Sequence, residues 1–435
     1  MLPESLENKL HQVTEASRKA HQVPEVQFAS RFREKGFYGA ALTQCNSIEG
    51  LLKYLWQLNL DPNEDFRVYP MTHEHSIPGF VAGEYLATGR KIAAIYQNSG
   101  LYNAGDGFVS FAENYGIPLL AVSTFRGIGE RSYPHNSIAR RTIDLARNII
   151  GRRDGVYGSP LGLDLLEDLD VATDRVNGKE KDKKGKEKPP QAILLLPGSV
   201  IENTLPKGLP NRANTDYKKL DLRVKADKGT MEEDYLEREM VSRDEALIEI
   251  MRRHPVALRI FCNGFTARAA LQVKDLPGNF YNAAYMGGGV AIGYGAAISN
   301  LGLEVVVVDG DQNRQMGAAM NAMLDEYYPK NLHIYTLNNG GASSVNAAIP
   351  SVSLSYWDYD LTHVIETCID DSTTFEHSRV EDGMLNLFNP KNAEILKREA
   401  GELKEITKRV RRWMEQEGKD PVKIPEVFRE SIQRL

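Results

Sequence analysis

The sequence predicts an α/β protein built from two doubly wound parallel-sheet domains. Its 435 residues leave room for two or three domains, each with a core of its own. Short apolar, strand-like runs alternate with helical patterns, which is typical of β-α-β units and a parallel sheet. This alternation occurs twice, once before and once after a polar stretch, so the two halves of the chain share one architecture.

The first half begins with an arm, residues 1–27, whose sparse apolar residues fit a short surface helix or a loose extension. A first domain is expected over residues 28–202, with strands in FRVYP, KIAAIYQNSG and GIPLLAVSTF and helices in IEGLLKYLWQLN and PGFVAGEYLATG. Within it, the charged low-complexity segment 177–190 cannot bury a core. We predict that this segment is a disordered surface insertion.

The second half follows a polar linker, residues 203–240, rich in Pro, Gly and charge. A second domain is expected over residues 241–400, with strands in ALRIFCNG, EVVVVDGD and LHIYTLNNGG. The stretch GVAIGYGAAISNLG predicts a helix of small residues that can pack close to a sheet, and residues 313–327 predict a further helix. Residues 401–435 predict a charged helical tail.

Composition narrows the classes of function. The net charge of -6 and the pI near 5.9 argue against nucleic acid as a partner. Cys45, Cys262 and Cys368 lie far apart, which suits a reducing compartment and excludes a zinc ribbon. The N-terminus has no apolar signal region, and no apolar run reaches membrane-spanning length. We therefore expect a cytoplasmic protein that binds neither nucleic acid nor a membrane.

Hard oxygen donors follow two successive strands of the second domain. Asp311 comes after EVVVV, and Asn339 comes after the next strand, LHIYTL. Because ligands gather at the carboxyl ends of parallel strands, these side chains are expected to meet. With the backbone carbonyl of Gly341 they suit Mg²⁺ or Ca²⁺ and leave positions for phosphate oxygens. Gly310 lets the backbone approach a diphosphate, and a helix starting near Asn313 would point its N-terminus at that anion.

Two other interpretations of these residues stay open. Acidic and Asn-Gly residues also mark ordinary turns between strands and helices. A dinucleotide-binding fingerprint is the other possibility, since GGGVAIG at residues 287–293 is followed by Asp309. Its spacing is Gly-x-Gly-x-x-x-Gly, however, and the preceding NFYNAAYM makes a poor buried strand. Close helix packing explains these glycines better.

Taken together, the motifs resemble those of thiamine-diphosphate-dependent enzymes, in which Asn-Asn follows a Gly-Asp-Gly. The stretches MTHEHSIPGFVAGEYLATGRK, YQNSGLYNA, YGIPLLAVSTFRG, CNGFTARAALQVKDLPGNFYNAAYMGGG and PEVFRESIQRL are similar in particular to phosphonopyruvate and sulfopyruvate decarboxylases. The resemblance implies a pyrimidine-binding domain followed by a diphosphate-binding domain, with thiamine diphosphate and Mg²⁺ as cofactors. It also implies a homodimer or homotetramer with the active site at the subunit interface.

The resemblance assigns roles to individual residues. Glu74 matches the glutamate that hydrogen-bonds the aminopyrimidine ring and promotes its imino tautomer, whereas without the resemblance a solvated helix-end carboxylate is the alternative. Met286 matches the bulky residue between the two cofactor rings. The expected cofactor-binding residues are Glu74, Gly264, Thr266, Met286, Gly287, Gly310, Asp311, Gln312, Asn313, Asn339 and Gly341. Of these, Asp311, Asn339 and Gly341 would hold the metal.

Substrate contacts are expected from the first domain. Asn98 and Ser99 follow a strand and would face the active site. Arg126 could bind an anionic substrate tail by a bidentate contact, or form a surface salt bridge instead. His75 and His135 are candidate catalytic proton donors, for which a structural role is equally open.

The activity that the resemblance implies is the non-oxidative decarboxylation of an anionic, small-molecule 2-oxo acid to the aldehyde, with phosphonopyruvate or sulfopyruvate as leading substrates. Carboligation by the same chemistry and a non-catalytic, cofactor-binding partner subunit are the alternatives. Gln312 stands where the family has the second Gly of Gly-Asp-Gly, which favours the partner subunit. The stretch IGERSYPHNSIARR departs from the family where substrate selectivity would be set.

Overall fold

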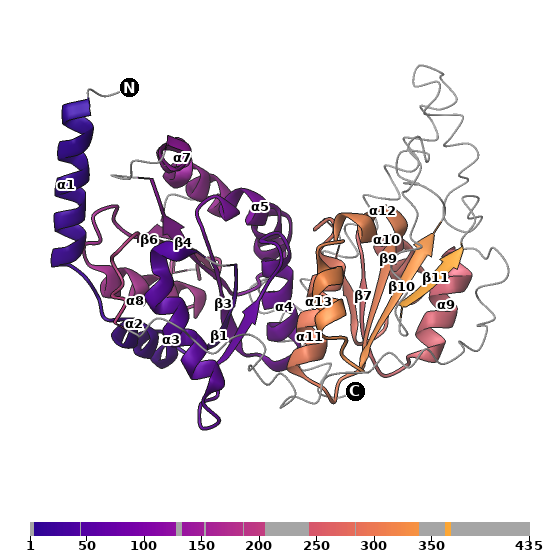
Figure 1. Ribbon diagram of the computed structural model, residues 1–435. Coiled ribbons are helices and arrows are strands. Elements are labelled where there is room, and N and C mark those ends of the chain that lie inside the picture. Colours follow the sequence, from indigo (N-terminus) through magenta and orange to yellow (C-terminus); the bar gives the residue numbers. More distant parts are fainter. Residues whose placement is uncertain are drawn as a thin grey trace, which may run out of the picture. The chain divides into compact units, whose positions relative to one another are not determined.

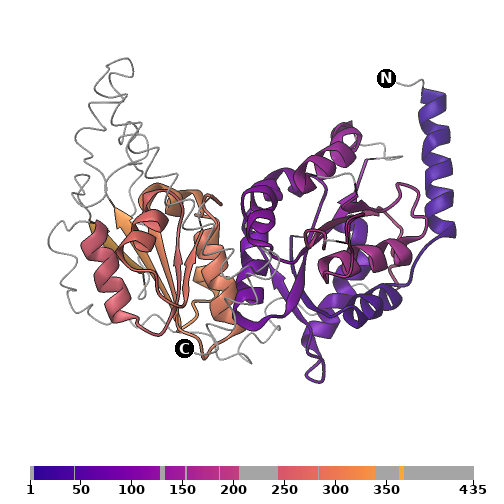
Figure 2. The ribbon, with the colours of Figure 1, turned by 180° about the vertical axis from the view of Figure 1, so that it is seen from behind.

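The chain divides into two compact units in its computed structural model. The structure describes residues 4–43, 45–127, 133–151, 154–185, 187–204, 243–282, 284–338 and 362–366. Unit 1 comprises residues 1–85 and 89–221, and unit 2 comprises residues 86–88 and 222–435. Each unit contains one sheet with helices on its faces (Figures 1 and 2). Across the described ranges, no helix is both long enough and apolar enough to span a membrane.

Unit 1 is a six-stranded parallel sheet with the strand order β2-β1-β3-β4-β6-β5. Its strands are β1 (Phe37–Leu42), β2 (Arg67–Pro70), β3 (Lys91–Tyr96), β4 (Leu119–Phe125), β5 (Val156–Tyr157) and β6 (Gln191–Pro197). Its helices are α1 (Glu4–Ala20), α2 (Glu25–Glu34), η1 (Asn46–Ile48), α3 (Glu49–Leu60), α4 (Ser76–Thr88), α5 (Gly100–Asp106), the π-helix η2 (Gly107–Ala112), α6 (Glu113–Tyr115), α7 (Tyr133–Ile150) and α8 (Leu165–Val176).

One face of this sheet is covered by α2, α3 and α8, and the other by α4, α5 and α7 (Figure 1). Both β4 and β6 are buried along their whole length, as expected for central strands covered on two sides. On the first face, Phe28 and Phe32 of α2 pack with Leu51 and Leu55 of α3 and Leu169 of α8 in one apolar cluster. This core holds the strands of unit 1 in place, and the candidate site described below lies at the carboxyl ends of three of them.

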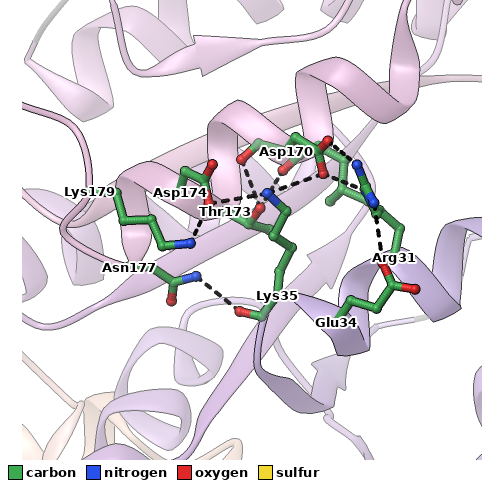
Figure 3. Close-up of polar contacts among 9 residues, drawn as sticks. Arg31, Glu34, Lys35, Asp170, Thr173, Asp174, Asn177 and Lys179 are labelled. Carbon is green, nitrogen blue, oxygen red and sulfur yellow. Dashed lines mark hydrogen bonds and ion pairs between the residues drawn. The ribbon is translucent and has the colours of Figure 1, made fainter.

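Polar side chains join α2 to α8 at the edge of that core (Figure 3). Arg31 donates two hydrogen bonds to Asp170, of 2.7 Å and 2.6 Å, in a bidentate pair. Lys35 donates to Asp174 at 3.1 Å, and the Asn177 amide donates to the carbonyl of Lys35 at 2.9 Å. These contacts hold two helices that are far apart in sequence against the same sheet face.

The charged segment 177–190 was expected to be disordered, and this is wrong for the residues that the structure describes. Lys181 and Glu187 form an antiparallel bridge, and the amide of Lys188 donates to the Glu180 carbonyl at 3.0 Å. The Lys188 ammonium lies 2.8 Å from the Asp154 carboxylate and 3.1 Å from that of Glu180. Because its opposite charges pair with each other and with unit 1, the segment folds without burying a core of its own.

Unit 2 is a five-stranded parallel sheet with the strand order β11-β10-β9-β7-β8. Its strands are β7 (Leu258–Phe261), β8 (Asn279–Tyr281), β9 (Val305–Gly310), β10 (Leu332–Asn338) and β11 (Thr362–Glu366). Its helices are α9 (Arg243–Arg253), α10 (Phe265–Val273), α11 (Gly289–Ser299), α12 (Asp311–Met316) and α13 (Met320–Glu326). The described elements of both units form parallel sheets, which confirms the predicted fold class.

Close packing of α11, predicted from its small residues, is confirmed. A Cβ placed on Gly293 would lie 2.2 Å from Cγ2 of Val307, and one on Gly289 would lie 2.0 Å from Sγ of Cys262. Both distances are far shorter than van der Waals contact. Glycine at these two positions therefore sets how closely α11 approaches β7 and β9.

Two details of unit 2 differ from the sequence prediction. Residues 313–327 do not form one helix, because α12 begins at Asp311 and ends at Met316, and α13 begins at Met320. The helix is interrupted at Gly317, where the backbone lies close to Gly287. A Cβ on Gly317 would lie only 2.5 Å from the Gly287 carbonyl oxygen. In addition, the start of NFYNAAYM was expected to be a poor strand, yet Asn279–Tyr281 is the fully buried strand β8.

Candidate functional site

Unit 2 has its topological switch point between β7 and β9. These strands are hydrogen-bonded neighbours, although β8 lies between them in sequence. The crossover connections leave this point in opposite directions, so the loops after β7 and β9 diverge there, and ligands of such sheets bind in the resulting crevice. The residues that directly follow the two strands, Cys262–Gly264 and Asp311–Asn313, therefore define the candidate site of unit 2.

Asp311 is the first residue of α12, and it is only 3% exposed. One carboxylate oxygen, Oδ1, accepts a hydrogen bond of 2.7 Å from the backbone amide of Gln312. Just before it, a Cβ placed on Gly310 would meet no atom of the described residues within 4 Å. A carboxylate beside open backbone fits a hard cation that carries a diphosphate. The other two predicted metal ligands, Asn339 and Gly341, lie outside the described residues.

The loop after β7 supplies the second wall of this site. Gly264 caps α10 with φ +82° and ψ -140°, a conformation that residues with a side chain rarely adopt. Thr266 is buried in the first turn of α10. Among the described residues, Oδ1 of Asn263 is buried without a hydrogen-bond partner. An unsatisfied buried oxygen at a switch point indicates that a bound group or water belongs there.

Partly buried hydrogen bonds connect β9 and the start of α12 to the loop that precedes α11. The side-chain amide of Asn313 donates to Oδ1 of Asp309, and its own oxygen accepts from the amide of Gly287 at 2.7 Å. Burial raises the pKa of Asp309 to about 6, against a smaller lowering by the hydrogen bond from Asn313. Asn313, predicted to bind the cofactor, thus uses both ends of its amide to position the loop at Gly287.

The predicted contact residues Met286 and Gly287 lie on that loop. Met286 is 49% exposed, in spite of its apolar side chain. Gly287 has φ +72°, and a Cβ there would lie 2.8 Å from the backbone carbon of Met316. The loop is therefore pinned by a close backbone approach while it presents a large apolar side chain outward.

Unit 1 carries its candidate site at the carboxyl ends of β1, β2 and β3. Glu74 lies in the turn between β2 and α4, and its two oxygens have separate partners. Thr43, just after β1, donates to Oε1 at 3.1 Å, and Asn103 of α5 donates to Oε2 at 3.0 Å. Gly100 makes room for the carboxylate, because a Cβ there would lie 2.6 Å from Cγ of Glu74. Glu74 is thus held in a defined, half-buried position.

These contacts decide the charge of Glu74. Burial raises its pKa, but the hydrogen bonds from Asn103 and Thr43, together with the backbone, outweigh burial and lower the pKa below its ordinary value of 4.5. Donors that favour the anion have this effect on a carboxylate. Without a bound group, Glu74 is therefore a carboxylate at neutral pH and accepts rather than donates hydrogen bonds.

The three predicted substrate residues lie at the end of β3 and β4. Asn98 is buried, and its amide donates to the carbonyl of Arg126 at 3.1 Å and to Oγ1 of Thr142 at 2.9 Å. The Arg126 guanidinium donates to Oε1 of Gln97 at 3.4 Å, and Nε2 of Gln97 donates to Oγ of Ser99 at 2.9 Å. Asn98 consequently positions Arg126 through its backbone, whereas Gln97 contacts the guanidinium itself.

The two candidate proton donors lie at helix starts. His75 precedes α4 directly and is half-buried beside His73, with the two ring centroids 6.2 Å apart. His135 is half-buried in the first turn of α7. Gly127, after β4, has φ +104°, and a Cβ there would lie 2.0 Å from the carbonyl oxygen of His135. This close approach places His135 next to the Arg126 loop.

Sequence reasoning missed four residues of the two sites: Thr43, Gln97, Asn103 and Asn263. Three of them, Thr43, Gln97 and Asn263, come one or two positions after a strand. That position was a usable signal, because ligands bind at the carboxyl ends of parallel strands. Which strand ends face the switch point depends on strand order, however, and strand order is not visible in the sequence.

Comparison with known proteins gives two sequence relatives, while no family model matches the chain. The chain is 28% identical over 321 residues to phosphonopyruvate decarboxylase from Streptomyces hygroscopicus, covering 71% of this chain and 73% of that protein. It is 35% identical over 83 residues to sulfopyruvate decarboxylase subunit alpha from Methanococcus maripaludis, covering 19% of this chain and 46% of that protein. Among solved structures, the thiamine diphosphate-dependent 4-hydroxybenzoylformate decarboxylase of Rhodococcus jostii aligns with a TM-score of 0.46 at 12% identity, over 80% of this chain and 100% of that one.

Proposed function

The chain belongs to the thiamine-diphosphate-dependent decarboxylases, and from this premise we propose that it uses thiamine diphosphate and Mg²⁺ to decarboxylate an anionic 2-oxo acid to the aldehyde. It is accordingly a carbon–carbon lyase. One observation carries the proposal: the Glu74 carboxylate, at the carboxyl edge of the unit 1 sheet, is fixed by Thr43 and Asn103 at 3.1 Å and 3.0 Å. A carboxylate with both oxygens oriented is what proton exchange with a ring nitrogen requires.

The residues of unit 2 fit the other end of the cofactor. We propose that Asp311 is a metal ligand and that Asn339 and the Gly341 carbonyl complete the set, since hard oxygen donors suit Mg²⁺. We propose that Gly264 and Gly310 leave space for the diphosphate, which is supported by a Cβ at either position meeting no atom of the described residues within 4 Å. When bound, thiamine diphosphate supplies the electron sink that takes up the electron pair left by carbon dioxide.

In this proposal Glu74 holds a proton at the aminopyrimidine ring nitrogen of the cofactor. Its lowered pKa makes it anionic before the cofactor binds, so it is ready to accept a hydrogen bond from a protonated ring. Thr43 and Asn103 keep the carboxylate from rotating as the proton moves. Met286, exposed on its loop, is proposed to contact the cofactor rings through its apolar side chain.

An anionic tail on the substrate is proposed because Arg126 lies in the unit 1 site. Its guanidinium offers donors in a planar fork that matches phosphonate or sulfonate oxygens. Gln97, hydrogen-bonded to it, orients that fork. Ser99 is proposed to contact the substrate directly, with His75 and His135 as proton donors. The leading candidate substrates are phosphonopyruvate and sulfopyruvate, the acids after which the two related enzymes are named.

We further propose a cytoplasmic homodimer or homotetramer in which each active site combines unit 1 of one copy with unit 2 of another. Light scattering of the active protein tests the assembly, because a fully active monomer would contradict it. Mixing an inactive Glu74→Gln chain with an inactive Asp311→Asn chain is a sharper test. Shared sites regain part of the activity in the mixed oligomer, since some sites then contain both intact residues.

The activity test starts from full-length protein freed of metal with EDTA. Thiamine diphosphate, Mg²⁺ and one oxo acid are then added, and carbon dioxide and aldehyde are measured. We expect turnover of phosphonopyruvate or sulfopyruvate only when both cofactors are present, and much slower turnover of pyruvate, which lacks the anionic tail. Absence of carbon dioxide release from all three acids, by protein that binds the cofactor, would contradict a decarboxylase.

A non-catalytic partner subunit is the second candidate, and Gln312 is the residue that favours it. It places a side chain in the first turn of α12, where the Gly of the usual motif has none. Titration with thiamine diphosphate and Mg²⁺, in the wild type and in Gln312→Gly, measures how far Gln312 weakens cofactor binding. Carbon dioxide release by the cofactor-bound protein then distinguishes the candidates, because a non-catalytic partner subunit binds the cofactor without turning over the oxo acid. Adding an acceptor aldehyde to the assay detects carboligation as a carbon–carbon bonded product.

A further inference from the structure

A second cluster of potential metal ligands lies at the opposite edge of the unit 2 sheet. His254 follows α9, Glu304 directly precedes β9, and His333 is the second residue of β10. The strands β7, β9 and β10 are adjacent, with Leu258 and Leu332 both paired to Val305, so their amino ends begin side by side. Asp311 lies at the other end of β9, roughly 20 Å away at about 3.3 Å per residue.

The three side chains converge closely. Nδ1 of His254 lies 2.8 Å from Oε1 of Glu304, and Nε2 of His333 lies 3.5 Å from the same oxygen. One ligand atom from each residue falls within a group whose members are all within 4.8 Å of one another. Ligand atoms of a tetrahedral zinc site, with bonds of about 2.0–2.1 Å, are separated by roughly 3.3 Å. Small side-chain rotations bring this cluster to that spacing.

The partners of His254 orient it for ligation. Its other ring nitrogen, Nε2, lies 2.8 Å from the hydroxyl of Tyr335, and its backbone carbonyl accepts a hydrogen bond of 2.5 Å from Arg259. A hydrogen bond at one imidazole nitrogen fixes the tautomer and directs the other nitrogen toward a metal. Tyr335 is therefore a positioning residue for Nδ1 of His254.

We propose that His254, Glu304 and His333 bind one divalent transition metal ion, with Zn²⁺ as the preferred ion. Two imidazoles and one carboxylate form a donor set typical of zinc, whereas Mg²⁺ prefers oxygen ligands alone. The side chains of His333 and Glu304 are 21% and 38% exposed, so an ion reaches the cluster from solvent and a water fills the fourth position. The ion ties α9 to the starts of β9 and β10, remote from the proposed cofactor site.

The competing explanation is a hydrogen-bonded cluster that binds no metal. The guanidinium of Arg259 bears on this choice, because its positive charge interacts with Glu304 and opposes a cation. Its donors are engaged, however, by Oδ1 of Asn279 at 2.7 Å and the carbonyl of Pro277 at 2.8 Å, as well as by His254. The guanidinium is thus held in place and cannot enter the cluster as a substitute for the ion.

Zinc titration of the full chain tests the proposal. Protein without an affinity tag, freed of metal by chelator dialysis, is titrated with Zn²⁺ against a competing chelator dye. We expect one equivalent of zinc per chain, and with Co²⁺ the intense visible absorption of a four-coordinate ion. His333→Gln and Glu304→Gln change partly exposed side chains, and each weakens zinc binding at least about tenfold. Tyr335→Phe weakens it about 10–100-fold if the hydroxyl orients the ligand.

Two control variants separate this site from others. His21→Gln removes an exposed histidine of unit 1, and Asp311→Asn removes the proposed magnesium ligand; neither changes zinc affinity. Circular dichroism confirms that each variant is folded. Folded wild-type protein that binds no zinc would overturn the proposal, and so would unchanged zinc affinity in both His333→Gln and Glu304→Gln.

Discussion

The side-chain amide of Asn103, on α5, donates a hydrogen bond of 3.0 Å to Oε2 of Glu74, in the turn before α4. The second oxygen of Glu74 is occupied independently by Thr43. The carboxylate plane is therefore fixed by residues that follow β1 and β3, the two strands at the switch point of unit 1. Its orientation is set by the fold before any ligand binds.

Replacing Glu74 with Gln tests its proposed role. Gln keeps the size and the hydrogen-bonding reach of Glu but cannot take up a proton, so we expect kcat for decarboxylation to fall at least about 100-fold. The fold should be retained, because an amide can still accept a hydrogen bond from Thr43 through its oxygen. Carbon dioxide release and circular dichroism measure the two effects. A folded Glu74→Gln variant with undiminished kcat would show that Glu74 has no catalytic role.

Asn103→Ala should make the free energy of unfolding depend less on pH in the acidic range. The native pKa of Glu74 lies below its ordinary value of 4.5, so its ionisation stabilises the fold above that pH, and the stabilisation is lost as pH falls through the native pKa. Without the Asn103 donor the native pKa rises toward 4.5. At neutral pH the variant should be less stable by roughly 0.5–1 kcal/mol, allowing for solvent screening of this half-exposed carboxylate. Urea unfolding at a series of pH values measures the difference.

Asn114→Ala is the matched control for this experiment. Asn114 is also exposed, but its amide donates only to the backbone carbonyls of Val109 and Ser110, at 3.2 Å and 3.0 Å. Among the described residues, the groups through which Asn114 contributes to stability are therefore ones that do not titrate. The gap between wild type and Asn103→Ala should close below pH 4.5, whereas the gap for Asn114→Ala should stay constant. Parallel pH curves for both variants would disprove the assigned role of Asn103.

Much of the fold could be predicted because its signals are local. Strand β9 begins with the apolar run Val305–Val308, and Gly310 and Asp311 follow within three residues, so the strand, the turn and the candidate ligand occur within one short stretch. The small residues of α11 likewise indicated close packing without knowledge of the partner strand. The strand and the close packing of α11, whose signals lie within one stretch of sequence, agree with the structure, whereas the role of Asp311 stays a prediction.

The features that could not be predicted from the sequence depend on contacts between segments that are far apart in the chain. The three residues Thr43, Glu74 and Asn103 follow three different strands, β1, β2 and β3, and only the strand order brings them together. Ion pairs act in the same way on the charged segment 177–190, whose lysines and acids find partners such as Asp154 elsewhere in unit 1. Composition alone predicted disorder there because it counts charges without locating their partners.

Gly293→Ala tests how tightly α11 packs on its sheet. The added methyl group would lie 2.2 Å from Cγ2 of Val307, so the helix must move or Val307 must leave its position. Overpacking of this kind costs about 1–3 kcal/mol of unfolding free energy. Adding Val307→Ala, which removes the opposing methyl groups, should restore part of the loss. Thermal unfolding of both single variants and the double variant measures the coupling, and additive losses would contradict direct contact between the two positions.

Two variants, Gly264→Ala and Gly310→Ala, distinguish the effect of backbone strain from the effect of a methyl group that obstructs the proposed cofactor site. A Cβ at either position meets no atom of the described residues within 4 Å, so neither substitution creates a clash within that part of the protein. Gly264, however, has φ +82° and ψ -140°, whereas Gly310 has the extended values -82° and 155°, which any residue adopts. Gly264→Ala should therefore lower the free energy of unfolding by about 1–3 kcal/mol, while Gly310→Ala leaves it nearly unchanged.

Thiamine diphosphate binding gives the second measurement on the same pair. If Gly310 lies against the diphosphate, its new methyl group weakens cofactor affinity in a protein of normal stability, whereas Gly264→Ala lowers affinity and stability together. Urea unfolding and calorimetric titration with thiamine diphosphate and Mg²⁺ measure the two quantities. If Gly310→Ala binds the cofactor as tightly as the wild type, Gly310 is not part of the proposed site. The added methyl group would then lie away from the diphosphate.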